Sequence, residues 1–233
     1  MEIVPNVHVI PGAIVNVYLL IDTDGLTLID TGLAGNNKKI LKYIAGLSKQ
    51  PSDLKRIILT HSDGDHVGAL AALKAATGAR VYANPIEAKA IQAGHPSRAL
   101  KVRGVLALFF KVMFIFFKVK PATIDETLSN GEVLPVLGGL RVVETIGHTP
   151  GHISLFAPSA KILFAGDSMT ASADSQLRTS RGRNTWDEAK AIEAVKIQAA
   201  LGAQIVCVGH GPIVRDAANK FPQKNEGTLI CAD

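Results

Sequence analysis

The sequence predicts an α/β fold with a ligand site at the edge of a sheet. Short, apolar, β-branched runs are followed by stretches with helical spacing, as at residues 56–60 and 67–76. A dense group of histidines and aspartates fills residues 61–66, directly after the first of these runs. Open α/β folds place ligands at the carboxyl ends of strands, where helices begin. The order of elements and the position of the polar group therefore indicate the same fold class.

The amino-terminal half is expected to begin with strands and then to alternate between strands and helices. Strands at 16–21 and 26–30 flank Asp22–Gly25, which has the composition of a hairpin turn. A helix from 37 to about 47 has its apolar residues on one face. The next expected elements are a strand at 56–60, a helix at 67–76 that stops at Gly78, a strand at 80–83 and a short helix from Pro85.

The carboxyl-terminal half returns to strand patterns. A hairpin formed by 132–136 and 140–145 leads into a stretch rich in glycine and histidine. A basic, loop-like segment at 168–184 precedes a helix at 186–201. Further strands are expected at 153–156, 161–165 and 205–208.

Residues 98–120 interrupt the alternation with an apolar insertion that contains most of the phenylalanines. The apolar stretch is shorter than the ~20 residues of a transmembrane helix, and Lys111 lies in its middle. We expect it to pack against its own protein or a second subunit, in a homodimer; a lid over the site and a membrane-facing segment are the alternatives. The flanking basic residues that would face anionic lipid are Arg98, Lys101, Arg103, Lys118 and Lys120.

Composition sets the broad class. The chain has 233 residues, 47% of them hydrophobic, which is enough for one large domain or two small ones. Its net charge of +5 is mostly scattered, so no nucleic-acid partner is expected. Two cysteines form no disulfide framework, and the first residues do not have the pattern of a signal peptide. We therefore expect a cytoplasmic protein, peripheral to a membrane if the insertion faces lipid.

The polar group at 61–66 predicts metal binding. His61 and Asp63 can project the same way from an extended chain, whereas Asp65 and His66 diverge and suit a neighbouring ion. Helix capping would explain one carboxylate and neither histidine. Other histidines at strand ends or beside glycine are His148, His152 and His210, and Asp167 follows another strand. Together these residues favour a binuclear hydrolytic site.

The order of five separated motifs resembles the metallo-β-lactamase superfamily. The motifs are Asp30-Thr31-Gly32, His61-x-Asp63-x-Asp65-His66, His148, Asp167 and His210, and the resemblance runs from residue 16 to about 212. It implies a single domain over residues 1–233, built as a four-layer αββα sandwich of two mixed β-sheets with helices on the outer faces. It also implies the stand-alone hydrolase branch, without added nuclease or flavin domains.

The resemblance assigns roles to the polar residues. It places His61, Asp63 and His148 on a first metal, Asp65, His66 and His210 on a second, and Asp167 between them. Asp30 would hold a ligating imidazole by its other nitrogen. The commonest family motif has histidine where this chain has Asp63, and a carboxylate there favours iron or manganese more than an imidazole does. We expect two divalent ions, with zinc as the first candidate and iron or manganese as alternatives.

Two such ions about 3.5–4 Å apart lower the pKa of a bridging water and polarise a carbonyl or phosphoryl oxygen. Hydroxide would then attack an ester, lactone, thioester or related bond of a small-molecule substrate, while Asp65 orients the water and passes its proton to the leaving group. Arg178, Arg181 and Arg183 are candidates for an anionic group of the substrate, with a solvated loop as the alternative. His152 is either a structural residue in a turn or a polar wall of the pocket.

Other functions stay open at this point because fold does not decide among the bonds that such sites cleave. A phosphodiester is the nearest alternative substrate. A di-iron redox protein is a second alternative, since the carboxylate-rich motif is similar to that of oxygen- or NO-reducing relatives. A non-catalytic module that binds a membrane or partner through 98–120 is a third.

Overall fold

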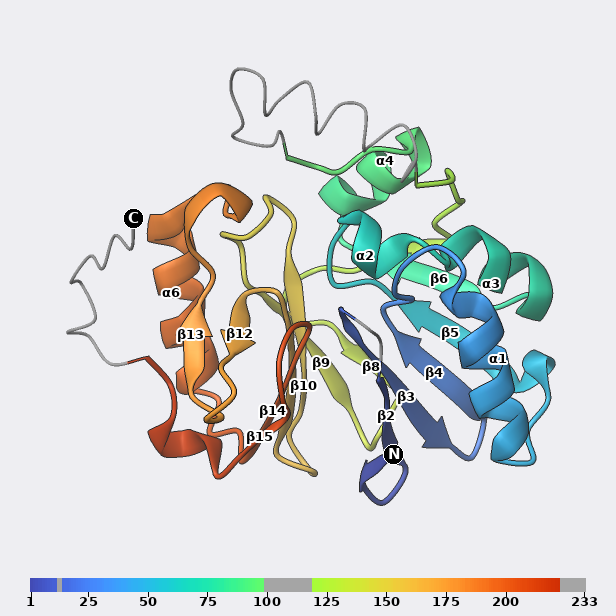
Figure 1. Ribbon diagram of the computed structural model, residues 1–233, viewed down its shortest axis with the longest axis horizontal. Helices are drawn as coiled ribbons and strands as arrows, with labels where there is room; N and C mark the ends of the chain where they lie inside the picture. The colour runs from blue at the N-terminus through green and yellow to red at the C-terminus, as the bar shows by residue number, and fades with distance from the viewer. Residues whose placement is uncertain (12–13, 99–118, 223–233) are drawn as a thin grey trace.

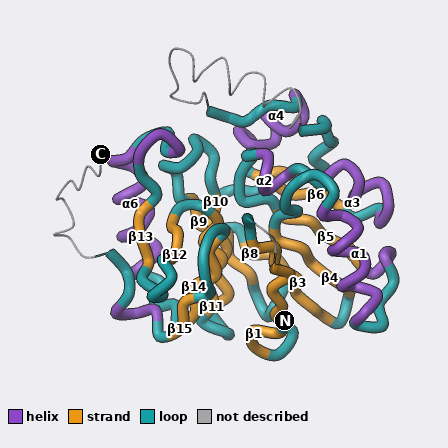
Figure 2. Tube along the Cα trace, in the orientation of Figure 1, coloured by secondary structure: helices purple, strands orange, loops and turns teal. Residues whose placement is uncertain are grey.

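Two β-sheets lie face to face, with helices outside them (Figure 1). The computed structural model describes residues 1–11, 14–98 and 119–222, and the structural statements that follow concern these residues. Figure 2 shows the strands of both sheets in the middle of the molecule and most of the helical residues at its flanks. This is the αββα arrangement expected for the chain.

The first sheet has seven strands in sequence order, antiparallel from β1 to β4 and parallel from β4 to β7. Its strands are β1 (Glu2–Val4), β2 (Val7–Pro11), β3 (Asn16–Asp22), β4 (Gly25–Ile29), β5 (Leu54–Ile58), β6 (Arg80–Ala83) and β7 (Glu126–Thr127). Helices α1 (Asn36–Gly46), α3 (Leu70–Thr77) and α4 (Pro85–Ala93) belong to this half, and the short α2 (Gly64–Val67) follows β5.

The second sheet has six strands in the order β15-β14-β11-β10-β9-β8. The strands are β8 (Val133–Leu134), β9 (Leu140–Glu144), β10 (Ile153–Ala157), β11 (Ile162–Gly166), β14 (Ile205–Val208) and β15 (Val214–Arg215), and α6 (Glu188–Ala199) covers the outer face. The segment 168–184, expected as a loop, instead contains a hairpin of β12 (Met169–Ala171) and β13 (Leu177–Thr179). Short 3-10 turns occur at Pro51–Asp53, Gly182–Asn184 and Ala217–Asn219.

Three hydrophobic clusters fill the spaces between the layers. The central cluster joins the two sheets; there the ring centroids of Tyr18 in β3 and Phe164 in β11 lie 5.3 Å apart. The Tyr18 hydroxyl also donates a hydrogen bond of 2.6 Å to the carbonyl oxygen of Val208 in the opposite sheet. The outer clusters pack α1 and α3 on the first sheet and α6 on the second. Burial on both faces of each sheet explains why many strands read as continuous apolar runs.

The sequence patterns placed most elements correctly but missed one break. The single helix expected at 67–76 is divided into α2 and α3 around Gly68. A Cβ atom added to Gly68 would lie 2.4 Å from the backbone nitrogen of Ala34, so the loop after β4 passes too close for any side chain. The break lets α2 turn its polar residues toward the sheet edge.

Asp125, directly before β7, contacts helix α3 and strand β6, and these contacts give a prediction about stability. Its carboxylate accepts hydrogen bonds from Lys74 Nζ of α3 and from the backbone N–H of Val81 in β6. Burial alone would raise the pKa of Asp125, but these two donors lower it below its ordinary value. A carboxyl whose pKa is lower in the folded protein stabilises the fold above its unfolded pKa of about 3.9, and this contribution is lost as the pH falls through the folded pKa.

Asp125→Asn is therefore expected to lower the free energy of unfolding by about 1 kcal/mol at pH 7. Urea unfolding of both proteins between pH 7 and pH 3 measures this difference, which should shrink below pH ~4. A difference that stays constant with pH would show that the ionised form of Asp125 contributes nothing.

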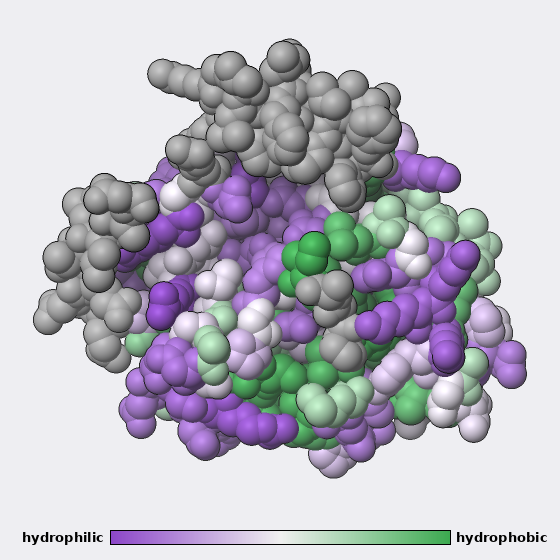
Figure 3. Space-filling view, in the orientation of Figure 1, coloured by the Kyte–Doolittle hydropathy of each residue, from purple (hydrophilic) through white to green (hydrophobic). Residues whose placement is uncertain are grey.

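On the face in Figure 3, hydrophobic residues gather toward the lower middle of the view, near the N-terminus, and hydrophilic residues cover much of the rest. No helix among the described residues has the length and hydrophobicity needed to cross a bilayer. Apart from Arg98, Val119 and Lys120, the insertion at 98–120 lies outside the described residues, so its expected role stays a prediction.

Candidate metal centre

All seven predicted metal ligands gather at one edge of the sandwich, where α2 begins (Figure 1). Each comes from a loop or short helix that follows a strand of one of the two sheets. Three overlapping groups could each hold an ion, with the ligand atoms of each group within 4.8 Å of one another. The groups are His61, Asp63 and His148 (the first group); Asp65, His66 and His210 (the second group); and His61, His66 and Asp167.

Asp167 lies between the first and second groups. Its Oδ1 is 3.3 Å from His66 Nε2, and its Oδ2 is 3.2 Å from His210 Nε2 and 3.7 Å from His148 Nε2. The backbone permits this position because position 209 carries no side chain: a Cβ atom on Gly209 would lie 2.1 Å from Asp167 Oδ1. One carboxylate can therefore reach histidines of both groups.

Three atoms that face the centre are buried without a hydrogen-bond partner among the described residues. They are His61 Nε2, His66 Nε2 and Asp167 Oδ1. Their residues form the third group, which takes His61 from the first group and His66 from the second. Leaving such atoms unpaired costs about 1–3 kcal/mol each, so their convergence requires a partner. Imidazole nitrogens and carboxylate oxygens suit zinc, iron and manganese. The residues present thus fit the binding of divalent metal.

The opposite ring nitrogens of the histidines are held by the protein. His66 Nδ1 lies 2.8 Å from Asp30 Oδ2, and the same carboxylate accepts hydrogen bonds from the backbone N–H and the hydroxyl of Thr60. The other Nδ1 atoms lie 2.9 Å from Thr60 Oγ1 for His61, 3.0 Å from Ser180 Oγ for His148 and 2.8 Å from the carbonyl oxygen of Ile14 for His210. These contacts fix the ring orientations and direct each Nε2 toward the centre.

Asp30→Asn tests the role proposed for Asp30. The amide nitrogen cannot accept the Nδ1–H bond of His66, so this ring loses its orientation and part of its basicity. We expect the second group to bind its ion about 10–100-fold more weakly. Competition with a chromophoric chelator measures the affinity, and Asp125→Asn, which is remote from the centre, should bind as the wild type does. Equal affinities for Asp30→Asn and wild type would exclude this role.

The electrostatic potential at the centre favours cations. Burial alone would lower the pKa of His66, but the carboxylates of Asp167 and Asp30 raise it well above its ordinary value. Hydrogen bonds to Asp167 and Asp65 likewise raise the pKa of His210 to about 10. Burial would raise the pKa of Asp167, but the histidines around it lower that pKa well below the usual range. Surroundings that stabilise protons on two imidazoles also stabilise a divalent cation in their place.

Glu87 in α4 is a structural member of the site that the sequence patterns did not reveal. Its fully buried carboxylate accepts four hydrogen bonds, from the backbone N–H groups of Ser62 and Gly151 and from the hydroxyls of Ser97 and Thr149. It therefore ties the loop that carries His61 to the loop that carries His148. In the sequence, Glu87 has the appearance of an ordinary first-turn acid after the N-cap Asn84.

The contacts of His152 favour the structural role over the role of a pocket wall. Its ring is fully buried, Nδ1 lies 2.8 Å from Thr145 Oγ1, and Nε2 accepts a 3.0 Å hydrogen bond from the backbone N–H of Asp167. Burial and the neighbouring histidines keep its pKa well below the ordinary value. Both ring nitrogens are used within the protein, and one of them helps to position Asp167. Contact of His152 with substrate stays a prediction.

Two of the three predicted arginines are exposed at the surface. Arg178 is exposed in β13 and Arg181 is exposed after it, and the side chain of Arg183 is outside the described part. Ser180, between Arg178 and Arg181, contacts a predicted ligand, because its Oγ lies 3.0 Å from His148 Nδ1. Contact of the arginines with substrate stays a prediction.

Arg98 would face lipid only in the membrane-facing alternative for the insertion, and the structure places this side chain elsewhere. Its side chain is 4% exposed and pairs with Asp63 Oδ2. Its Nη2 also lies 3.4 Å from His148 Nε2. A guanidinium buried among metal ligands does not face lipid.

Comparisons with known proteins agree with this geometry. The family model for the metallo-beta-lactamase superfamily matches residues 10–210. The Bacillus subtilis proteins YobT and "Probable metallo-hydrolase YflN" are 28% and 27% identical; each match covers 90% of this chain, and 88% and 85% of those proteins respectively. A hydroxyacylglutathione hydrolase of Cereibacter sphaeroides is 26% identical over 72% of this chain, which spans about half (52%) of that protein.

Solved structures show the same fold at lower identity. A metallo-beta-lactamase family protein of Thermus thermophilus has a TM-score of 0.71 at 24% identity, covering 94% of this chain and 78% of that one. A Cronobacter sakazakii metallo-beta-lactamase has the same TM-score and identity, with coverage of 91% and 77%. The family match and the named hydrolases together place the chain in the metallo-β-lactamase superfamily as a metal-dependent hydrolase.

Proposed function

We propose that the protein uses two divalent ions, zinc as the first candidate, to hydrolyse a carboxylic ester, lactone or thioester of a small molecule. The observation that carries the proposal is that two ligand groups share one centre, with Asp167 within 3.3 Å of His66 and 3.2 Å of His210. When bound, two adjacent ions activate water and polarise the oxygen of the bond to be cleaved.

The residues of the chain hold that arrangement and provide a proton acceptor. The side chain of Asp65 is 29% exposed and that of Asp167 is 9% exposed, so Asp65 is the more open of these two carboxylates. Burial would raise the pKa of Asp65, but the hydrogen bond with His210 and the charge of His66 lower it. A carboxylate at the open side of the centre is suited to accept the proton of the attacking water and to deliver it to the leaving group.

The surface beside the ligands supports an acyl substrate over a phosphodiester. The carbonyl oxygen of Ile14 holds His210, and the backbone N–H of Trp186 donates to the carbonyl oxygen of His148. The side chains of Ile14 and Trp186 are nevertheless 60% and 38% exposed. Exposed apolar residues whose backbone contacts two metal ligands favour an apolar acyl group in the substrate. The relatives named hydroxyacylglutathione hydrolase add support for a thioester.

A substrate panel tests the proposal. Zinc-, manganese- and iron-loaded proteins are assayed against acyl thioesters, aryl esters, lactones and a bis-aryl phosphodiester. We expect the highest kcat/KM for a carboxylic substrate, with loss of turnover on chelation and recovery when metal is returned. Turnover of the phosphodiester alone would replace the proposed substrate class. Two bound irons with a visible redox-sensitive absorption band and no hydrolysis would support the redox alternative.

A further inference from the structure

The Arg98–Asp63 pair is a feature of the metal centre that the proposed function does not use. Asp63 is a member of the first group, and Arg98 pairs with it. Arg98 follows α4, in a segment that supplies none of the seven predicted ligands. The residue before it is fixed at the centre: the backbone N–H of Ser97 donates to Ser62 Oγ at 2.8 Å, and its hydroxyl donates to Glu87 at 2.8 Å. These contacts hold the start of the Arg98 side chain beside the ligand loop.

The oxygen that receives Arg98 is also the oxygen that faces the metal ligands. Asp63 Oδ2 lies 3.2 Å from His148 Nε2 and 3.7 Å from His61 Nε2, and it accepts the hydrogen bond from Arg98. A cation held by the first group would use the same three atoms. The guanidinium and the ion therefore share one carboxylate oxygen at short range.

Charge explains why such a pair occurs here. Asp63 stands where the commonest family motif has a histidine, so the first group carries one more negative charge than the motif supplies. The positive charge of Arg98 offsets it, and the pair has the same net charge as one neutral imidazole. A buried carboxylate without a partner would be costly, and a buried guanidinium is equally so.

The second group has a different environment. The ion pairs that Asp65 and Asp167 make within the described residues all involve histidines, which lose their protons when they bind metal. The guanidinium of Arg98, in contrast, is a permanent cation in proteins. Its charge therefore persists beside the first ion and repels it at a distance where Coulomb energies are large.

We infer that Arg98 is a built-in cation that shares Asp63 with the first metal ion, so that the first group binds its ion more weakly than the second and the two ions load in sequence. This inference rests on the proposed two-ion function. Arg98 positions the carboxylate of Asp63 and sets the affinity of the first group for its ion. Asp63 and Arg98 together take the place, and have the net charge, of one neutral histidine.

Zinc titration of the metal-stripped protein against a competing fluorescent chelator tests the inference by affinity alone. We expect two binding events of unequal affinity in the wild type. Arg98→Met keeps an unbranched apolar side chain and removes the guanidinium with its charge, so it should tighten the weaker event by about tenfold or more and leave the stronger event unchanged. Arg98→Lys keeps the charge and should retain the weak event.

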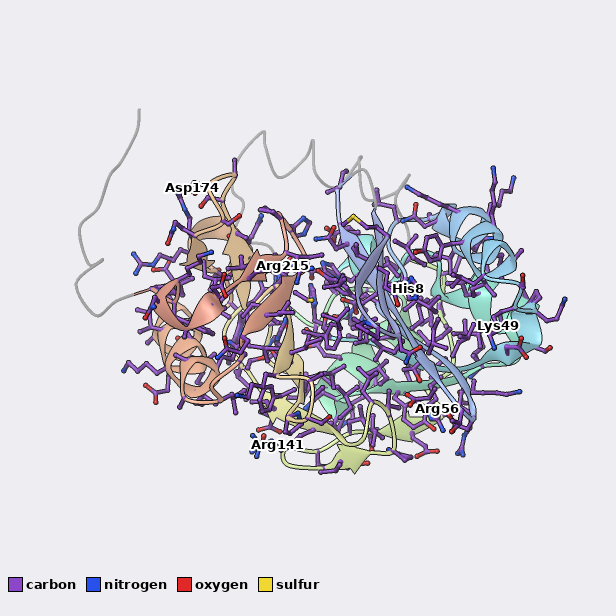
Figure 4. The ribbon with its side chains drawn as sticks, turned by 90° about the horizontal axis from the view of Figure 1, so that it is seen from below. His8, Lys49, Arg56, Arg141, Asp174 and Arg215 are labelled. Carbon is purple, nitrogen blue, oxygen red and sulfur yellow. The ribbon has the colours of Figure 1, made fainter. Side chains whose placement is uncertain are left out.

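The matched control is Arg56→Met. Arg56, which is labelled in Figure 4, also forms an arginine–aspartate pair, with Asp24. Asp24 lies in the turn before β4, whereas Asp30 follows the other end of that strand. Removal of the Arg56 guanidinium should leave both zinc affinities unchanged. Circular dichroism and thermal unfolding of every variant identify any that fail to fold.

Asp63→His supplies an independent test that leaves Arg98 in place. The guanidinium then loses its partner, so the weaker zinc event should become weaker still, and Arg98→Met added to Asp63→His should restore it. Two zinc ions with unchanged affinities in Arg98→Met, or tighter binding in Asp63→His alone, would overturn the inference while leaving the two-ion function intact. A protein that binds no second zinc with or without Arg98 would overturn both.

Discussion

Asp167→Asn is expected to reduce bound metal from two ions per chain to one or fewer and to lower kcat/KM by about 10³-fold. Asp167 is the carboxylate that reaches histidines of both groups, at 3.2 Å from His210, 3.3 Å from His66 and 3.7 Å from His148. Its loss removes several kcal/mol of charge stabilisation, and each 1.36 kcal/mol corresponds to tenfold in rate. The amide keeps the shape of the side chain, so any effect reports on charge and coordination.

Elemental analysis and steady-state kinetics measure the two effects of Asp167→Asn. Asp174→Asn is the control, because Asp174 is an exposed acid in the β12–β13 turn (Figure 4). It should retain both ions and full turnover. An Asp167→Asn protein that holds two ions and hydrolyses substrate at the wild-type rate would show that Asp167 does not connect the two groups.

Glu87→Ala is expected to have the largest effect on stability. The substitution leaves four donors without their acceptor, two of them backbone N–H groups in the ligand loops. At about 1–3 kcal/mol for each buried unpaired group, partly offset by water that enters the cavity, we expect a loss of about 3–5 kcal/mol. Domains are stable by only about 5–15 kcal/mol, so this loss is a large fraction of the total.

The position of Glu87 predicts a second consequence, because the loops it ties carry His61 and His148 of the first group. Zinc affinity at that group should fall together with stability. Urea unfolding and chelator competition measure the two effects, Glu87→Gln should give a smaller loss of both, and Glu193→Ala on the exposed side of α6 should give neither. Full stability and full zinc affinity in Glu87→Ala would contradict the role given to this carboxylate.

The sequence predicted the parts of the fold that depend on local patterns. Strands β3 to β6, β9 to β11 and β14 follow apolar, β-branched runs, and helices α1 and α6 follow periodic spacing and end near the expected residues. Strands β1 and β2 were missed because residues 2–11 contain prolines and polar residues that weaken the pattern. The hairpin of β12 and β13 was missed because two strands of three residues carry too little periodicity.

The ligands were predictable because their residue types are unusual at strand ends, whereas the groups that hold them were not. Glu87 and Ser180 have no distinctive sequence context, and their roles arise only when α4 and the loop after β13 pack against ligand loops. The contact of Arg98 with Asp63 and His148 was not predicted, because in the sequence Arg98 stands beside an apolar insertion and far from both residues. Pairing across distant segments is a tertiary property, which no local pattern encodes.

The metal content of the purified protein decides whether the centre holds two ions. The protein is purified without chelator, dialysed against a small excess of zinc, manganese or iron, freed of unbound metal and measured by elemental mass spectrometry. We expect two ions per chain with at least one of these metals. No retained metal after such loading, or one ion that persists unchanged in the Asp167→Asn protein, would contradict a two-ion hydrolytic centre.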